Sequence, residues 1–305
     1  MIMKDYHVPV LLKDCIDALG VSENPNGIYV DVTFGGGGHS EEILKYLKKG
    51  KLYAFDCDED AALNRIKDKR FKLIQKNFSE LKTALLKEKI TGIDGLLADL
   101  GVSSHQFDSA ERGFSIRFDT ELDMRMNKSS EGVTASDILR SYSENDLRRV
   151  FSEYGELHNA LHIAKVIVKN RLHRNITVNE FKNMIAICVD KRKENQFYAK
   201  VFQALRIEAN NELSNLKELL LQSKDVLKAG GKMAVISYHS LEDRLVKNFF
   251  RSGKFEGDIE KDMYGNSLSP FQVVTRQPIV PGENEIEHNN RARSAKLRVA
   301  ERTIN

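Results

Sequence analysis

The chain has 305 residues, of which 41% are hydrophobic and 30% are charged, and its formal net charge is +3. This length predicts about two domains, since domains usually span roughly 100 to 200 residues, and the apolar fraction excludes an intrinsically disordered chain. The small net charge neither indicates nor excludes nucleic-acid binding, because the placement of the 47 basic residues decides that question.

Cysteine spacing and hydropathy narrow the class further. Cys15, Cys57 and Cys188 lie far apart and form no C-x-x-C pair, which disfavours a structural zinc site and a disulfide framework. No apolar run approaches the roughly 20 residues that span a bilayer. We therefore expect no metal, no membrane partner and a cytoplasmic protein.

The first hundred residues alternate between short apolar runs and amphipathic segments. We predict strands over 28–33, 51–56, 71–74 and 93–100, and helices over 39–48, 58–67 and 79–87. This alternation predicts a parallel sheet with helices on both faces, in which ligands bind beyond the carboxyl ends of the strands.

The middle of the chain has helical periodicity instead. A capping pair, Ser143 and Asp146, opens one amphipathic helix, and a T-x-x-E capping box, Thr177 to Glu180, opens another. We expect an all-helical domain over 107–206, inserted into a discontinuous sheet domain of residues 1–106 and 207–305.

The doubly wound pattern then resumes. Leucines from Leu205 to Leu220 predict one face of a long helix that Gly230–Gly231 end. A strand over 233–238 and a helix over 241–250 follow. Two last strands, over 272–280 and 294–301 with no helix between them, predict an antiparallel hairpin at the sheet edge.

Four glycines, Gly35 to Gly38, follow the first strand. Glycine is costly in chain entropy, so such a cluster suits close approach of a ligand to the backbone. A P-loop is excluded because His39 and Ser40, not Lys and Ser/Thr, follow, and Ser40 also breaks the dinucleotide pattern G-x-G-x-x-G. Asp56 stands where a ribose-binding acid belongs. These features leave S-adenosylmethionine (SAM), NAD and a turn without a ligand open.

Longer strings distinguish these alternatives. They are Thr33–Ser40 (TFGGGGHS), Asp99–Gln106 (DLGVSSHQ), Glu111–Ser115 (ERGFS), Leu122–Met126 (LDMRM), Phe202–Ile207 (FQALRI), Ile236–Arg244 (ISYHSLEDR) and Arg291–Arg298 (RARSAKLR). With them the chain closely resembles the bacterial MraW family, the ribosomal RNA small subunit methyltransferases H, over nearly its whole length. It departs from the family pattern at His105, where proline is usual, and at residues 118–121.

The resemblance implies an α/β fold: a class I SAM-dependent methyltransferase (Rossmann-like) sheet with an inserted helical domain. It also implies transfer of a methyl group from SAM to N4 of a cytidine, cytosine 1402 in the family, of 16S rRNA in the 30S subunit. A homodimer is compatible with it. The residues that it places against SAM are Gly37, Gly38, His39, Asp56, Phe78, Asp99 and Gln106.

The chemistry of the reaction suggests further residues. A cytosine amino group is a poor nucleophile because its lone pair is delocalised into the ring, so acceptors for its N–H groups would help. We hypothesise that Asp99, with Ser103 and Ser104, lines the meeting point of methyl and amine, and that His239 flanks it. The alternatives are a turn for the serines and a loop hydrogen bond for His239.

Basic residues are unevenly distributed. Lys165 to Arg174 carries four cations and no acid, Lys191 to Lys193 is a second run, and the tail from Arg291 to Arg302 is a third. Such runs are usually solvated faces; in the insert they favour contact with rRNA phosphates. His158 and His162 stand four apart on a predicted helix but lack the H-E-x-x-H pattern of a zinc site. An NAD-dependent oxidoreductase, a non-catalytic RNA-binding factor and a methyltransferase with another substrate are the competing functions.

Overall fold

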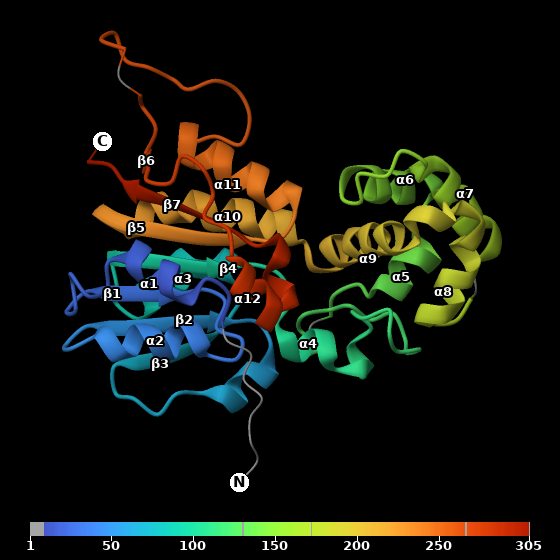
Figure 1. Cartoon of the computed structure of the whole chain (residues 1–305), viewed down its shortest axis with the longest axis horizontal. Helices are drawn as coiled ribbons and strands as arrows, with labels where there is room; N and C mark the ends of the chain where they lie inside the picture. The colour runs from blue at the N-terminus through green and yellow to red at the C-terminus, as the bar shows by residue number, and fades with distance from the viewer. Residues whose placement is uncertain (1–8, 130, 172, 266, 305) are drawn as a thin grey trace. The chain divides into compact units, whose positions relative to one another are not determined.

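The computed structural model describes residues 9–129, 131–171, 173–265 and 267–304, with the backbone alone at 104 and 105 (Figure 1). These residues form two compact units. Unit 1 comprises the described residues up to Gly101 and from Ser214 onward, and unit 2 is Val102–Leu213. The insert expected over 107–206 lies within unit 2, which extends beyond it at both ends.

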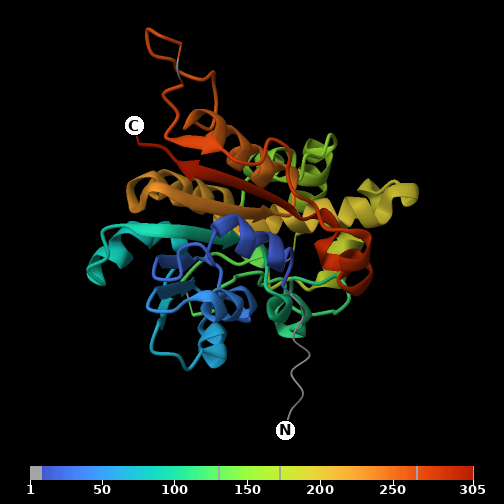
Figure 2. The same ribbon diagram turned by 60° about the vertical axis from the view of Figure 1, so that its left-hand side comes forward.

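Unit 1 is built on a seven-stranded sheet in the order β3-β2-β1-β4-β5-β7-β6. Its strands are β1 (Ile28–Asp31), β2 (Lys51–Asp56), β3 (Phe71–Gln75), β4 (Ile93–Asp99), β5 (Leu227–Ser237), β6 (Phe271–Val273) and β7 (Lys296–Arg302). The strands β1 to β5 are mutually parallel, whereas β7 runs antiparallel to both β5 and β6; Figure 2 shows β5 and β7 side by side. The antiparallel edge predicted from the sequence is confirmed.

Helices cover both faces of this sheet. The helices of unit 1 are α1 (Leu12–Leu19), α2 (Gly38–Tyr46), α3 (Leu81–Lys87), α10 (Glu212–Val226), α11 (Ser240–Ser252) and α12 (Glu283–His288), with 3-10 turns η1 (Glu59–Asn64), η2 (Phe78–Glu80) and η6 (Asn290–Ser294). Strand side chains alternate between the faces. Tyr29 packs in the cluster that contains α1 and α2, whereas Val30 packs with α3, α10 and α11.

Four predictions about these elements are wrong. The helix expected over 58–67 is only the 3-10 turn η1, because Ala61 is its single buried residue and Leu63 is 85% exposed, so no apolar stripe holds a helix on the sheet. The single long helix predicted from Leu205 to Leu220 is divided into two helices, because Asn211 adopts a left-handed conformation between α9 (Glu194–Asn210) and α10.

Gly230–Gly231 do not end that helix. The chain passes from α10 directly into β5, and the glycines lie within this strand, where its register with β4 shifts. A glycine at such an irregularity supplies the positive φ of 78° that Gly230 adopts. The last two strands were predicted to have no helix between them, and this is wrong, because α12 and η6 separate them.

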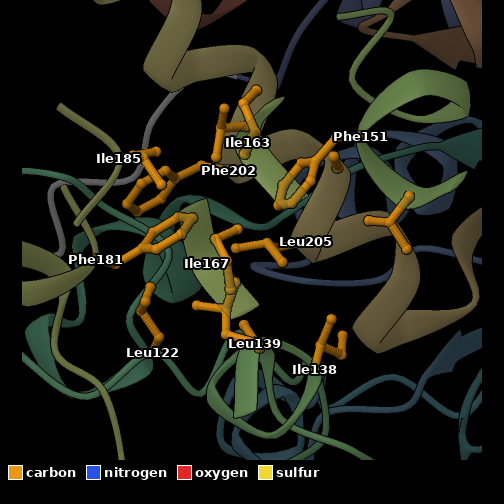
Figure 3. Packing of buried hydrophobic residues seen from close by; sticks show 14 of the residues in the cluster. Leu122, Ile138, Leu139, Phe151, Ile163, Ile167, Phe181, Ile185, Phe202 and Leu205 are labelled. Carbon is orange, nitrogen blue, oxygen red and sulfur yellow. The ribbon is translucent and has the colours of Figure 1, made fainter. Parts of the chain in front are cut away.

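Unit 2 is helical and has a core of its own (Figure 3). Its helices are α4 (Ser104–Asp108), α5 (Ala135–Ser141), α6 (Glu144–Glu153), α7 (Ala160–Asn170), α8 (Val178–Ile185) and α9, with 3-10 turns η3 (Ala110–Arg112), η4 (Ala186–Cys188) and η5 (Lys191–Lys193). Ser143 caps α6, and Thr177 and Glu180 form the capping box of α8, as predicted. No helix in the described ranges is long and apolar enough to cross a membrane.

Candidate active site

Three aspartates end three neighbouring parallel strands of unit 1. Asp31 closes β1, Asp56 closes β2 and Asp99 closes β4, and β1 lies between the other two. The glycine loop, Gly35 to Gly38, leaves this same edge and leads into α2. The edge is where doubly wound sheets bind their ligands, so we refer to it as the carboxylate edge.

Asp31, which was not predicted from the sequence as a site residue, organises the glycine loop. Its side chain is only 1% exposed. One carboxylate oxygen accepts a hydrogen bond from the Thr33 backbone N–H (3.1 Å), and the other accepts from the Ser40 hydroxyl (2.7 Å). The Thr33 hydroxyl in turn accepts from the Asp99 backbone N–H (2.7 Å). The signal available in the sequence was an aspartate at a strand end, two residues before threonine, a pattern typical of a side-chain turn.

The glycine loop needs its glycines for its own conformation. Gly37 has a φ of +85°, which favours glycine. A Cβ at Gly38 would lie 2.3 Å from Cγ of Pro9, so any side chain there would displace the segment before α1. The glycines therefore do not by themselves indicate a ligand, and the carboxylates around them carry more information.

Asp56 combines burial with unused acceptor capacity. Its two oxygens accept from the backbone N–H groups of Gly35 (2.7 Å) and Asp58 (2.8 Å). Burial raises the pKa of Asp56 to about 6, against the effect of these two hydrogen bonds. A carboxylate offers about four lone pairs, so Asp56 can still accept from ligand hydroxyls. Phe78 is half-buried and follows β3, whose Gln75 pairs with Asp56 in the sheet.

Asp99 is held by two side chains from other elements. Its Oδ1 accepts a hydrogen bond from the Tyr238 hydroxyl (2.7 Å), and its Oδ2 lies 3.8 Å from Nδ1 of His39. The Nε2 atom of His39 lies 3.0 Å from the Val10 carbonyl, which can only accept, so Nε2 carries a proton. Burial raises the pKa of Asp99, while His39 and Tyr238 oppose that shift. The carboxylate stays 23% exposed and can meet a ligand.

His239 stands on the same edge, at the start of α11. Its Nδ1 accepts from the Glu242 backbone N–H (3.4 Å), and its Nε2 lies 3.2 Å from Oε1 of Glu242. It is therefore the N-cap of α11. These contacts fix the loop that follows β5. The catalytic role expected for His239 remains a prediction.

Ser103 and Gln106 belong to unit 2, where they bind each other. The Gln106 side-chain oxygen accepts from the Ser103 backbone N–H (3.0 Å), and the Ser103 hydroxyl accepts from the Gln106 backbone N–H (3.2 Å). This pairing caps the short helix α4 and fits the turn interpretation of Ser103. Gln106 is 5% exposed. The side chain of Ser104 lies outside the described residues.

The charge of the carboxylate edge selects among the ligands that the sequence left open. Asp31 and Asp58 both add to the upward shift in the pKa of Asp56, as Asp31 does for Asp99. Such a cluster repels the pyrophosphate of a dinucleotide and attracts a sulfonium cation, and carboxylates accept hydrogen bonds from ribose hydroxyls. With this sheet order and its antiparallel β7, the fold and site define a class I SAM-dependent methyltransferase.

Comparison with known proteins places the chain within this class. The model of the MraW methylase family matches residues 4–303. The protein therefore belongs to the MraW methylase family.

Curated relatives match over the whole length. The chain is 55% identical over 303 residues to the ribosomal RNA small subunit methyltransferase H of Cytophaga hutchinsonii, covering 97% of this chain and 99% of the relative. It is 54% identical over 302 residues to the protein of that name from Christiangramia forsetii, with 98% and 99% covered. A solved rRNA methylase from Streptococcus thermophilus is more distant, at 13% identity and a TM-score of 0.44 over 98% of this chain and 99% of that one.

Proposed function

We propose that the protein transfers the methyl group of SAM to N4 of cytidine 1402 in 16S rRNA, within the assembled 30S subunit. Membership of the MraW methylase family, together with the full-length relatives that bear the ribosomal RNA methyltransferase name, carries this proposal. The negative carboxylate edge supports it from the chain's own chemistry.

The residues of the edge fit SAM in character and position. Asp56 accepts from the ribose hydroxyls, and Phe78 provides an aromatic surface at the neighbouring strand end. The start of α2 contributes the backbone at Gly37 and Gly38 and the ring of His39 to the proposed SAM site. Gln106 is assigned to the same ligand by the family resemblance. SAM supplies a methyl group that is already activated by its positive sulfur.

Asp99 has the chemistry to act on the amine. Its Oδ1 is oriented by Tyr238, whose own pKa is raised by burial and by Asp99, so the hydroxyl stays protonated and keeps donating. The remaining acceptor capacity of Asp99 takes an N–H of the cytosine amino group and favours localisation of the nitrogen lone pair. The raised pKa of Asp99 makes it a better proton acceptor than an ordinary aspartate when the methylated nitrogen loses its proton. Ser103, Ser104 and His239 complete the proposed catalytic set.

Unit 2 supplies an exposed cationic face for the RNA backbone. Lys165 and Lys169 are exposed on α7, and within the described part of the chain neither forms an ion pair. His162 shares their face, whereas His158 precedes α7, so the predicted helical pairing of the two histidines is wrong. We infer that this stripe, His162, Lys165 and Lys169, follows rRNA phosphates.

The other basic runs divide into paired and unpaired cations. Arg171 donates to the Tyr142 carbonyl (2.9 Å), Arg174 pairs with Glu180 and Arg192 lies 3.3 Å from Asp190. In the tail, Arg298 is 8% exposed and binds Asp243 (2.6 Å), so it braces β7 against α11. Arg171 and Arg298 are thus held by contacts within the fold, and Arg174 and Arg192 have acidic partners, so Lys165 and Lys169 are the cations that we propose for RNA.

Two experiments test the proposed function. Calorimetry should show binding of SAM and none of NAD. Mass spectrometry of rRNA from a strain that lacks this gene should show loss of a methyl group at cytidine 1402, restored by the wild-type gene. Unchanged rRNA in the deletion strain would contradict the proposal.

A further inference from the structure

The described residues 253–265 and 267–269, which lie between α11 and β6, form an arm that extends away from the rest of unit 1 in both views (Figures 1 and 2). Its two sides meet at a bridge between Lys261 and Ser267, and the Leu268 N–H donates to the Glu260 carbonyl (2.9 Å). The tip turns at Asp262, whose carbonyl accepts from the Gly265 N–H (3.0 Å). The arm is thus a small hairpin, although the catalytic proposal gives it no role.

The root of the arm is fixed to the core. The ring of Phe255 stacks on Phe249 with centroids 5.3 Å apart, and the Phe255 carbonyl accepts from the Asn248 side chain (2.9 Å). On the other side, Ser269 is 4% exposed, and its hydroxyl accepts from the Phe271 N–H (3.3 Å). Gly253 packs so closely on Pro270 that a Cβ would lie 2.5 Å from Cδ. A fixed root presents the tip in a defined direction.

The tip exposes large apolar side chains. Met263 is 88% exposed, Tyr264 is 82% exposed and Leu268 is 52% exposed. Folding gains nothing from leaving these side chains in water. Tyrosine and methionine are enriched in protein interfaces, where such side chains fill pockets of the partner.

The charge of the arm indicates what kind of partner would cover this tip. The arm carries Glu256, Asp258, Glu260 and Asp262 against two cations, Lys254 and Lys261, in a chain whose net charge is +3. Lys254 is already paired with Glu260. The excess of carboxylates repels phosphates, so RNA is disfavoured, and a basic protein surface is complementary to it.

We propose that the arm docks on a protein that presents a basic surface around an apolar pocket, with Met263 and Tyr264 as the anchors. Proteins that coat RNA carry basic surfaces because they neutralise phosphates. On the proposed function, on which this inference rests, such a partner is a protein component of the small ribosomal subunit. The arm then favours the assembled particle over free rRNA as the substrate.

The test compares two forms of the substrate. The double variant Met263→Ser, Tyr264→Ser should bind purified 30S subunits at least about tenfold more weakly than wild type, as loss of interface anchors does. Its affinities for protein-free 16S rRNA and for SAM should be unchanged. The matched control is Ile304→Ser, which removes an apolar side chain that is 91% exposed and lies outside the arm; it should bind as wild type does.

A charge reversal separates protein from RNA as the partner. The variant Glu256→Lys, Asp258→Lys should weaken binding to 30S subunits. If this lysine variant instead binds both subunits and free rRNA more tightly, the arm faces RNA and the proposal is overturned. The proposal is also overturned if the double serine variant binds subunits as tightly as wild type. If the wild-type protein binds and methylates free rRNA but binds 30S subunits no more tightly than free rRNA, the docking proposal for the arm is contradicted and the proposed function is retained. If the protein methylates neither substrate, the proposed function is contradicted.

Discussion

The carboxylate edge of unit 1 and the cationic face of α7 in unit 2 use charge in opposite ways. Asp31, Asp56 and Asp99 are fixed by hydrogen bonds from the backbone or from neighbouring side chains, and burial raises the pKa of Asp56 and Asp99. Lys165 and Lys169 are exposed. A small ligand with one correct pose needs acceptors positioned in advance, whereas a polyanion needs only mobile cations near its path.

Removal of the acceptor at the end of β4 should have the largest effect. Asp99→Ala should lower the rate of methyl transfer by at least about 100-fold, the scale seen when one preorganised polar group is lost from an active site. Single-turnover assays on 30S subunits would measure it. Tyr238→Phe, which keeps the carboxylate but removes its 2.7 Å hydrogen bond, should have a smaller effect. Near-wild-type turnover of Asp99→Ala with SAM binding intact would contradict the assignment.

Removal of the second acceptor should affect the cofactor alone. Asp56→Ala should weaken SAM binding by about 10- to 100-fold, since hydrogen bonds to a charged group contribute roughly 1.5–3 kcal/mol. Calorimetry measures the loss. Affinity for 16S rRNA should stay as in wild type, because the cations proposed for RNA lie in unit 2. Equal losses for both ligands would show that the variant had damaged the fold.

The raised pKa of Asp56 predicts a pH dependence for the same site. The ionised form accepts from ligand hydroxyls most strongly, and in the free protein it is lost as the pH falls below about 6. SAM affinity should therefore be constant above neutrality and fall below pH 6, by up to tenfold per pH unit. In Asp56→Ala this decline should be reduced. A wild-type affinity that stays flat down to pH 5 would show that the charge of Asp56 does not contribute.

Neutralisation of the α7 stripe should give the smallest and most salt-dependent effect. Lys165→Gln, Lys169→Gln should weaken rRNA binding and reduce the slope of log affinity against log salt by about 1.4–1.8, or 0.7–0.9 per phosphate contact. SAM affinity should be retained. Lys82→Gln, which removes a partly exposed cation paired with Asp225 in unit 1, serves as the control. An unchanged salt slope in the double variant would exclude this stripe as an RNA contact.

The parallel strands were predictable because each is a short apolar run that ends at a polar residue. The sequence also placed Asp56 and Asp99 at strand ends, as the structure shows. Asp31 was missed because its role depends on Ser40 and Thr33 folding back onto it, and no periodicity encodes such a contact. The break at Asn211 was missed for a similar reason: leucine spacing continues across it, and a single left-handed residue decides the boundary. Gly230 was taken for the end of a helix, where glycine is also common, although it lies at an irregularity within β5.

The basic runs also show that contacts between side chains could not be predicted from the sequence. The sequence counted Arg171, Arg174 and Arg192 with the lysines, because all are cations in acid-poor segments. Their partners, the Tyr142 carbonyl, Glu180 and Asp190, are known only from the structure. The local charge in the sequence therefore predicted the segments that contact RNA. The hydrogen bonds and ion pairs of the structure then distinguished cations with protein partners from cations that are available to RNA.

The central claim is the identity of the methylated atom. Purified protein should be incubated with methyl-labelled SAM and 30S subunits from a strain that lacks this gene, and the rRNA digested to nucleosides and to mapped fragments for mass spectrometry. We predict label in N4-methylcytidine alone, in the fragment that contains cytidine 1402, and none with Asp99→Ala. Label on a ring carbon, on a ribose, on another nucleotide or on a ribosomal protein would contradict it.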